Sequence, residues 1–174
     1  MMASMASASK HHQIIEDVFV TKEVNKAGIY LVRLFIRGKP WLVPVDDNFL
    51  FNRGEDKNLR FAKFIESSNS LWAPILEKAL AKVKGTYKQL EGGSPSNGMR
   101  FLTGAPSYWH PLHPTDEHRQ NEMWRIIKQS DNNGFIMTVG TGGGMADKNE
   151  CGVTNNHALS LLSAFYLQDP PANN

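Results

Sequence analysis

The chain has 174 residues, of which 41% are hydrophobic and 21% are charged, so it can bury the core of one domain or two small ones and is not a disordered tail. The 19 basic and 17 acidic residues are interspersed and give a net charge of +2, which argues against nucleic acid or anionic lipid as a partner. The only cysteine, Cys151, excludes an internal disulfide and fits a cytoplasmic, reducing environment, and no apolar run is long enough to span a membrane.

The beginning of the chain carries no clear structural signal. Its first residues, MMASMASAS, are small and lack the apolar stretch of a secretory signal peptide. We therefore interpret residues 1–13 as a disordered leader.

A β-hairpin is predicted next. β-Branched and aromatic residues fill 29–37 and 41–45 on both sides of Gly38-Lys39, and this pattern is typical of two strands joined by a tight turn, with the second strand starting after Pro40. One face of the first strand should be buried, and it would carry Tyr30, Val32, Leu34 and Ile36. Asp46 and Asp47 should end the second strand by binding nearby backbone amides.

The clearest predicted helix follows a polar cluster at residues 67–70, which offers several N-caps. The spacing of one helical face is kept by Trp72, Ile75, Leu76, Ala79, Leu80 and Val83. Pro74 fits only the first turn of this helix, and Gly85 should end it. The run Gly92-Gly93-Ser94-Pro95 then predicts a hinge between two halves.

The second half should contain one helix and then strands. The helix is expected over residues 117–129, after Thr115 or Asp116, with its end at residues 131–134. Strands are expected within 135–139 and within 153–166, separated by a glycine-rich connector. The whole pattern predicts an α+β fold with a helix-containing first half and a β-rich second half.

His157 is the strongest single candidate for chemistry. In GVTNNHALSLLSAF it opens an apolar strand after a polar turn, a place that can hold an imidazole at the edge of a cleft, although such histidines are more often structural. Cys151 lies nearby, but a nucleophilic cysteine usually sits at a helix N-terminus, and its glycine- and asparagine-bearing loop favours an unreactive thiol.

Two other clusters are weaker. The spacing of His110, His113, Asp116, Glu117 and His118 matches no closed zinc site, so a solvated loop is the preferred interpretation. The glycine run at residues 140–144 lacks the lysine of a P-loop and the spacing of a dinucleotide fingerprint.

Several segments, taken in order, resemble the core of calpain-type cysteine proteases. They are AGIY with the hairpin and VPVDDNF, then LWAPILEKALAKVKGTYKQLEGG, FLTGAP, MWRIIKQSDNNGFIMTV and NNHALSLLSAF, and together they cover about residues 27–166. The resemblance implies part of a papain-like core. Residues 14–93 would be the end of its first subdomain and residues 94–174 the start of its second.

The resemblance also implies roles for individual residues. His157 would be the catalytic histidine, which pairs with a cysteine thiolate and later protonates the leaving amine. Gly92 and Gly93 match a glycine pair that binds an extended substrate through the backbone. Thr138 would lie near a cleft-lining strand and Asn156 next to the histidine, so both are implied substrate-binding residues.

Other family features are missing from these 174 residues. The nucleophile motif should precede AGIY, and an Asn-Pro-Trp segment should follow the histidine strand, so we expect the chain alone to be inactive. Asn156 replaces a glycine and Leu159 a tyrosine. Calcium is implied by the family only, and because its acidic ligands fall near Ser67 or Ser70 here, no metal site is assigned.

The leading hypothesis is a segment of a calpain-like cytoplasmic endopeptidase that acts on proteins or peptides. It would bind the remainder of a protease core or copies of itself, because half a core leaves apolar faces uncovered. The alternative is a non-catalytic calpain-like binding or regulatory module. A third hypothesis, nucleotide binding by the glycine run, is expected to fail.

Overall fold

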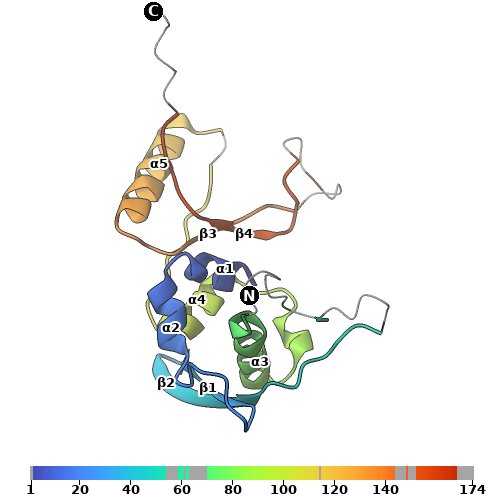
Figure 1. Cartoon of the computed structure of the whole chain (residues 1–174). Coiled ribbons are helices and arrows are strands. Elements are labelled where there is room, and N and C mark those ends of the chain that lie inside the picture. The colour runs from blue at the N-terminus through green and yellow to red at the C-terminus, as the bar shows by residue number, and fades with distance from the viewer. Residues whose placement is uncertain are drawn as a thin grey trace, which may run out of the picture. The chain divides into compact units, whose positions relative to one another are not determined.

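The computed structural model describes residues 2–53, 59–60, 62, 70–113, 115–143, 148 and 152–167. It divides into two compact units, Met1–Tyr108 and Trp109–Asn174, whose elements are labelled in Figure 1. The sequence predicted a division after Gly93, whereas the division into compact units lies after Tyr108. The difference arises from a helix, α4 (Pro95–Thr103), which packs against elements of the first unit and so belongs to that unit.

The predicted hairpin is present in the first unit. Strands β1 (Ile29–Ile36) and β2 (Lys39–Asp46) pair antiparallel, from Ile29 with Asp46 to Ile36 with Lys39. The turn is Arg37-Gly38, one residue earlier than expected, so Pro40 lies inside β2 opposite Phe35. The predicted buried face is confirmed for Tyr30, Val32 and Leu34, whereas Ile36 is only half-buried.

Helix α3 (Trp72–Lys84) confirms the strongest helical pattern. Pro74 lies in its first turn, and the backbone turns at Gly85, whose φ is 102°. Leu76 and Leu80 are fully buried, and the helix packs against both strands of the hairpin. Its N-cap is Leu71, which makes no side-chain capping bond, so Ser70 does not cap the helix; residues 67–69 lie outside the described part.

Two short helices precede the hairpin, α1 (Met2–Ser9) and α2 (His12–Val18). The interpretation of residues 1–13 as a disordered leader is therefore wrong. Met5 and Ala8 of α1 are buried, and Ser4 Oγ donates a hydrogen bond to the Pro95 carbonyl at 2.8 Å. Alanine favours helix, and small Ala and Ser side chains let α1 approach α4 closely, a packing mode that leaves little hydrophobic periodicity in the sequence.

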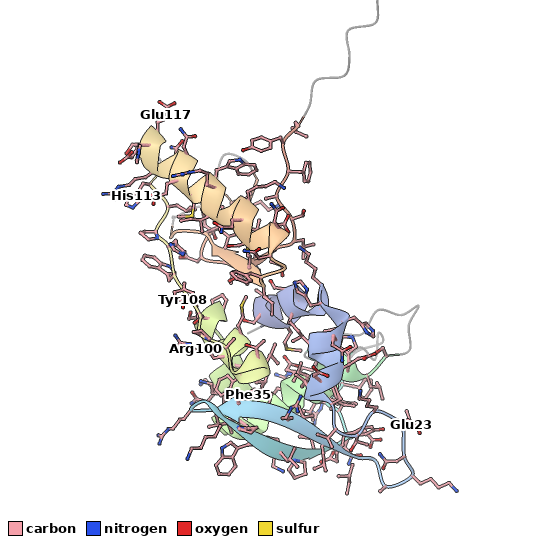
Figure 2. All side chains as sticks on the ribbon, turned by 90° about the vertical axis from the view of Figure 1, so that its left-hand side faces the viewer. Glu23, Phe35, Arg100, Tyr108, His113 and Glu117 are labelled. Carbon is pink, nitrogen blue, oxygen red and sulfur yellow. The ribbon has the colours of Figure 1, made fainter. Side chains whose placement is uncertain are left out.

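The second unit contains α5 (Glu117–Asn132), β3 (Met137–Gly140) and β4 (Ala158–Leu161). The predicted helix is confirmed, with Asp116 accepting a hydrogen bond from the Arg119 amide at 3.1 Å as its N-cap. Figure 2 shows Glu117 at its first turn. The strands are shorter than expected and pair antiparallel from Met137 with Leu161 to Gly140 with Ala158. Helices and small antiparallel sheets confirm the α+β class.

The first unit also contains the short 3-10 helix η1 (Tyr87–Leu90), which follows α3. Across the described ranges, no helix combines the length and the apolar character that crossing a bilayer would require.

Candidate functional site

The backbone of His157 is fixed at the end of the β3–β4 ladder by one threonine. The His157 amide donates to Thr141 Oγ1 at 2.9 Å, and the Thr141 amide donates to the His157 carbonyl at 2.9 Å. The Thr141 hydroxyl in turn donates to the Thr154 carbonyl at 2.7 Å. These bonds hold the residue before β4 in one conformation, while the histidine itself is exposed.

The residue before the histidine adopts an unusual backbone conformation. Asn156 has a φ of 51°, in the left-handed region where glycine and asparagine are the favoured residues. Its amide donates to the Gly142 carbonyl at 3.1 Å. A side chain at Gly143 would place its Cβ only 3.0 Å from Asn156 Oδ1. The close approach of the two loops therefore uses both Asn156 and the lack of a side chain at Gly143.

The remaining sequence-derived residues fall in different places. Thr138 lies in β3 and pairs with Ser160, so Thr138, Asn156 and His157 belong to one hairpin. Gly92 and Gly93 belong to the other unit and are exposed, with φ values of 73° and 98°. A Cβ at either glycine would meet no atom within 4 Å. Cys151 lies outside the described residues.

Potential metal ligands do not gather in the part of the chain that the structure describes, where no group of three or more His, Cys, Asp or Glu side chains could hold an ion. The His113 imidazole instead contacts the Arg119 guanidinium at 3.0 Å. Calcium needs several oxygen ligands, carboxylates above all. Ser70 offers only a hydroxyl where the family resemblance places an acidic ligand, so these residues do not fit a calcium site.

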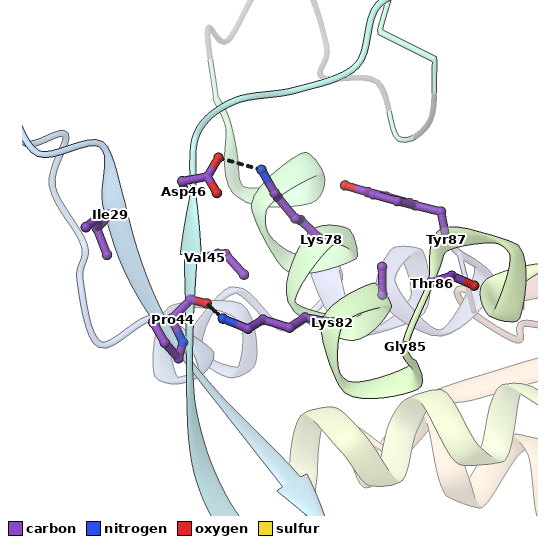
Figure 3. A pocket seen from close by; sticks show the side chains of 10 residues that line it. Ile29, Pro44, Val45, Asp46, Lys78, Lys82, Gly85, Thr86 and Tyr87 are labelled. Carbon is purple, nitrogen blue, oxygen red and sulfur yellow. Dashed lines mark hydrogen bonds and ion pairs between the residues drawn. The ribbon is translucent and has the colours of Figure 1, made fainter.

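A cavity of about 470 Å³ lies between β2 and α3 (Figure 3). At its edge Lys78 Nζ forms an ion pair with Asp46 at 2.7 Å, and Lys82 Nζ donates to the Pro44 carbonyl at 2.7 Å. The hydrogen bond from Lys78, helped by the Asn48 amide, lowers the pKa of Asp46 to about 2. Burial, together with nearby carboxylates, raises the pKa of Tyr87. The amines of Lys78 and Lys82 both bind groups of β2 and so hold α3 against the hairpin. Neither amine is therefore free to act as a base in this cavity.

The sequence did not single out two of these contacts. Thr141 was treated as part of a flexible connector, although a β-branched hydroxyl between a strand and a glycine run was a usable signal. Lys78 and Lys82 lie one turn apart on α3, so their shared direction toward β2 could have been inferred from helical spacing.

Comparison with known proteins places these features in a family. The model of the calpain family cysteine proteases matches residues 1–171, which include the segment interpreted as a leader. The chain is 32% identical over 152 residues to calpain-type cysteine protease ADL1 of Oryza sativa subsp. japonica, and equally to calpain-type cysteine protease DEK1 of Zea mays. It is 29% identical over 140 residues to the calpain-2 catalytic subunit of Homo sapiens.

These matches cover most of this chain and little of the relatives. The two plant alignments include 85% of the chain but 7% of each plant protein, and the human alignment includes 79% of the chain and 19% of the human protein. The chain thus corresponds to a segment of a protease domain. With the family model matching nearly its whole length, the chain belongs to the calpain family of cysteine proteases.

Proposed function

We propose that the chain is the histidine-bearing segment of an intracellular cysteine endopeptidase that hydrolyses peptide bonds in protein substrates. The observation that carries the proposal is the conformation of His157, whose backbone is fixed by Thr141 while the residue remains exposed. A general base must be held rigidly and still reach the group whose proton it takes.

The chemistry assigned to His157 is acyl transfer with a cysteine. The imidazole takes the thiol proton, and the thiolate attacks the carbonyl carbon of the scissile peptide bond. The imidazolium then gives its proton to the leaving amine, which leaves a thioester. Water hydrolyses the thioester with the imidazole as base, and the free thiol is restored. Gly92 and Gly93 would bind the extended substrate through backbone groups, because no side chain blocks the approach.

We further propose that these 174 residues do not cleave substrate alone. Their only cysteine is Cys151, and the glycine and asparagine residues near it in the sequence do not predict a helix N-terminus that would activate the thiol. Without a nucleophile, no acyl intermediate forms, and the remaining groups give no covalent catalysis. No step in this mechanism uses calcium.

A non-catalytic calpain-like module remains the second candidate. It was favoured by Asn156 and Leu159, which stand where the family resemblance places glycine and tyrosine. The left-handed backbone of Asn156 weakens this argument, since asparagine is the residue that best replaces glycine there. The substitution of glycine by asparagine is therefore compatible with the left-handed backbone conformation at this position.

The coding sequence upstream of Met1 distinguishes the two candidates. A protease requires an in-frame segment that resembles Gly-Asp-Cys-Trp, and the extended protein should cleave casein and react with a cysteine-directed epoxide. Both signals should disappear in the upstream Cys→Ser variant, and casein cleavage should disappear in His157→Ala. An upstream frame with no such cysteine, or an extended protein in which His157→Ala keeps full activity, would contradict the protease assignment.

A further inference from the structure

A basic pocket of about 590 Å³ lies in the first unit, between the hairpin turn and α4. Its lining includes three cations, Arg37, Lys84 and Arg100, and no aspartate or glutamate among the described residues. The volume is in the range of pockets that hold a small ligand or a few residues of a peptide. Figure 2 labels Phe35 on β1 and Arg100 on α4, which supply two of its walls.

The three cations of this lining have no anionic partner in the part of the chain that the structure describes. Among the described residues, no hydrogen bond or ion pair engages the side chain of Arg37, Lys84 or Arg100. The described contact of Lys84 is with the Phe101 ring, whose centroid lies 5.2 Å from Nζ. Three cations around one hollow, with no carboxylate in its described lining, create a positive potential that attracts an anion.

The backbone of Arg37 gives an independent reason to regard this surface as functional. Its φ is 52° and that of Gly38 is 77°, a pair typical of a type I′ hairpin turn, in which Asn-Gly is the favoured sequence. A long side chain with positive φ costs about 1 kcal/mol relative to glycine. Arginine is thus held here against local preference, and such outliers cluster at functional sites.

The lining of the pocket also contains apolar side chains. It includes Phe35, Phe101 and Pro106, and the Phe35 ring packs against Gly104, where a Cβ would come within 2.6 Å of the ring. A bare inorganic anion would leave these apolar groups exposed to water. A complementary ligand must therefore combine an apolar group with negative charge.

We propose that this pocket is a docking site for an acidic peptide segment of a partner protein, in which carboxylates flank an aromatic or aliphatic side chain. Carboxylates would pair with the two guanidinium groups, which can each bind two oxygens, and the apolar side chain would cover the rings. This site does not depend on the chemistry proposed for His157.

Isothermal titration calorimetry on the 174-residue chain tests the proposal with the unlabelled peptide acetyl-Glu-Asp-Phe-Asp-Glu-amide. Arg37→Asn and Arg100→Gln should each weaken binding about threefold to tenfold, and the double variant should weaken it further. The control Lys22→Asn removes an exposed charge outside the pocket and should change the affinity less than about twofold. Raising the salt from 50 to 300 mM should weaken the wild-type complex.

The Arg37→Asn variant also separates binding from folding. Because Asn-Gly suits the turn better than Arg-Gly, this variant should melt at the same or a higher temperature while it binds the peptide less well. Unchanged affinity in the double variant would overturn the proposal. A peptide with glycine in place of phenylalanine should bind more weakly. Equal affinity of the two peptides would show that the apolar lining residues do not contact the ligand, which would contradict the proposal. Displacement of the peptide by equimolar inorganic phosphate or ATP would show that the ligand class is wrong.

Discussion

Replacing Thr141 by valine removes the hydroxyl that joins β3 to the residue before β4. In the native chain this oxygen accepts from the His157 amide at 2.9 Å and donates to the Thr154 carbonyl at 2.7 Å. Each such bond contributes about 0.5–1.5 kcal/mol net. Water can replace part of the loss because His157 is exposed, so we expect the end of the hairpin to lose about 1–2 kcal/mol of local stability.

Hydrogen exchange of the His157 amide reports this change directly. A loss of about 1.4 kcal/mol corresponds to tenfold faster exchange, because every such increment changes an equilibrium constant tenfold. The Met137–Leu161 pair lies at the other end of the ladder and should exchange as before. Thr141→Ser keeps the oxygen and should stay within about twofold of the native rate. Native-like exchange at His157 in Thr141→Val would refute the argument that Thr141 fixes this residue.

Three further predictions concern stability. Asn156→Gly should leave the melting temperature nearly unchanged and Asn156→Val should lower it, because φ is 51°; equal melting by differential scanning fluorimetry would contradict this. Gly104→Ala should destabilise by about 2–3 kcal/mol in urea titration, because its Cβ would lie 2.6 Å from the Phe35 ring, whereas Gly92→Ala, with open space around it, should cost about 1 kcal/mol. Similar losses of stability in Gly104→Ala and Gly92→Ala would mean that the Phe35 ring moves aside, which would contradict the prediction. Burial raises the pKa of the Glu77 carboxyl in the folded chain. As pH rises above about 4.3, the carboxyl ionises in the unfolded chain before it ionises in the folded chain, so the free energy of unfolding falls. Glu77→Gln should therefore stabilise more at pH 8 than at pH 4, and urea titrations that show the reverse order would contradict the sign.

Strong periodicity made part of the fold predictable. The alternation in β1 and the helical face of α3 each depend on apolar residues that face one core, and most of them are buried as expected, whereas Ile36, Trp72 and Val83 are half-buried. The cap of α5 was predictable because Asp116 binds a local amide. These features were accessible because sequence neighbours decide them.

Other features depend on tertiary contacts that a pattern does not contain. Helix α1 is held by small residues and by the bond from Ser4 to Pro95, which lies far along the chain. Arg37 turns the hairpin with a positive φ that propensity alone disfavours. At the candidate site, the sequence indicated His157 but not Thr141, because the bonds that fix the histidine join two separate loops.

The most direct test of the central claim is a casein-cleavage assay of the purified 174-residue chain, run beside Cys151→Ser and His157→Ala and combined with labelling by a cysteine-directed epoxide. We expect no casein cleavage above background in any of the three proteins, and no labelling of Cys151 faster than that of a free thiol in a denatured chain. Casein cleavage by the native chain that disappears in Cys151→Ser would show that this polypeptide already contains its own nucleophile and would contradict the account.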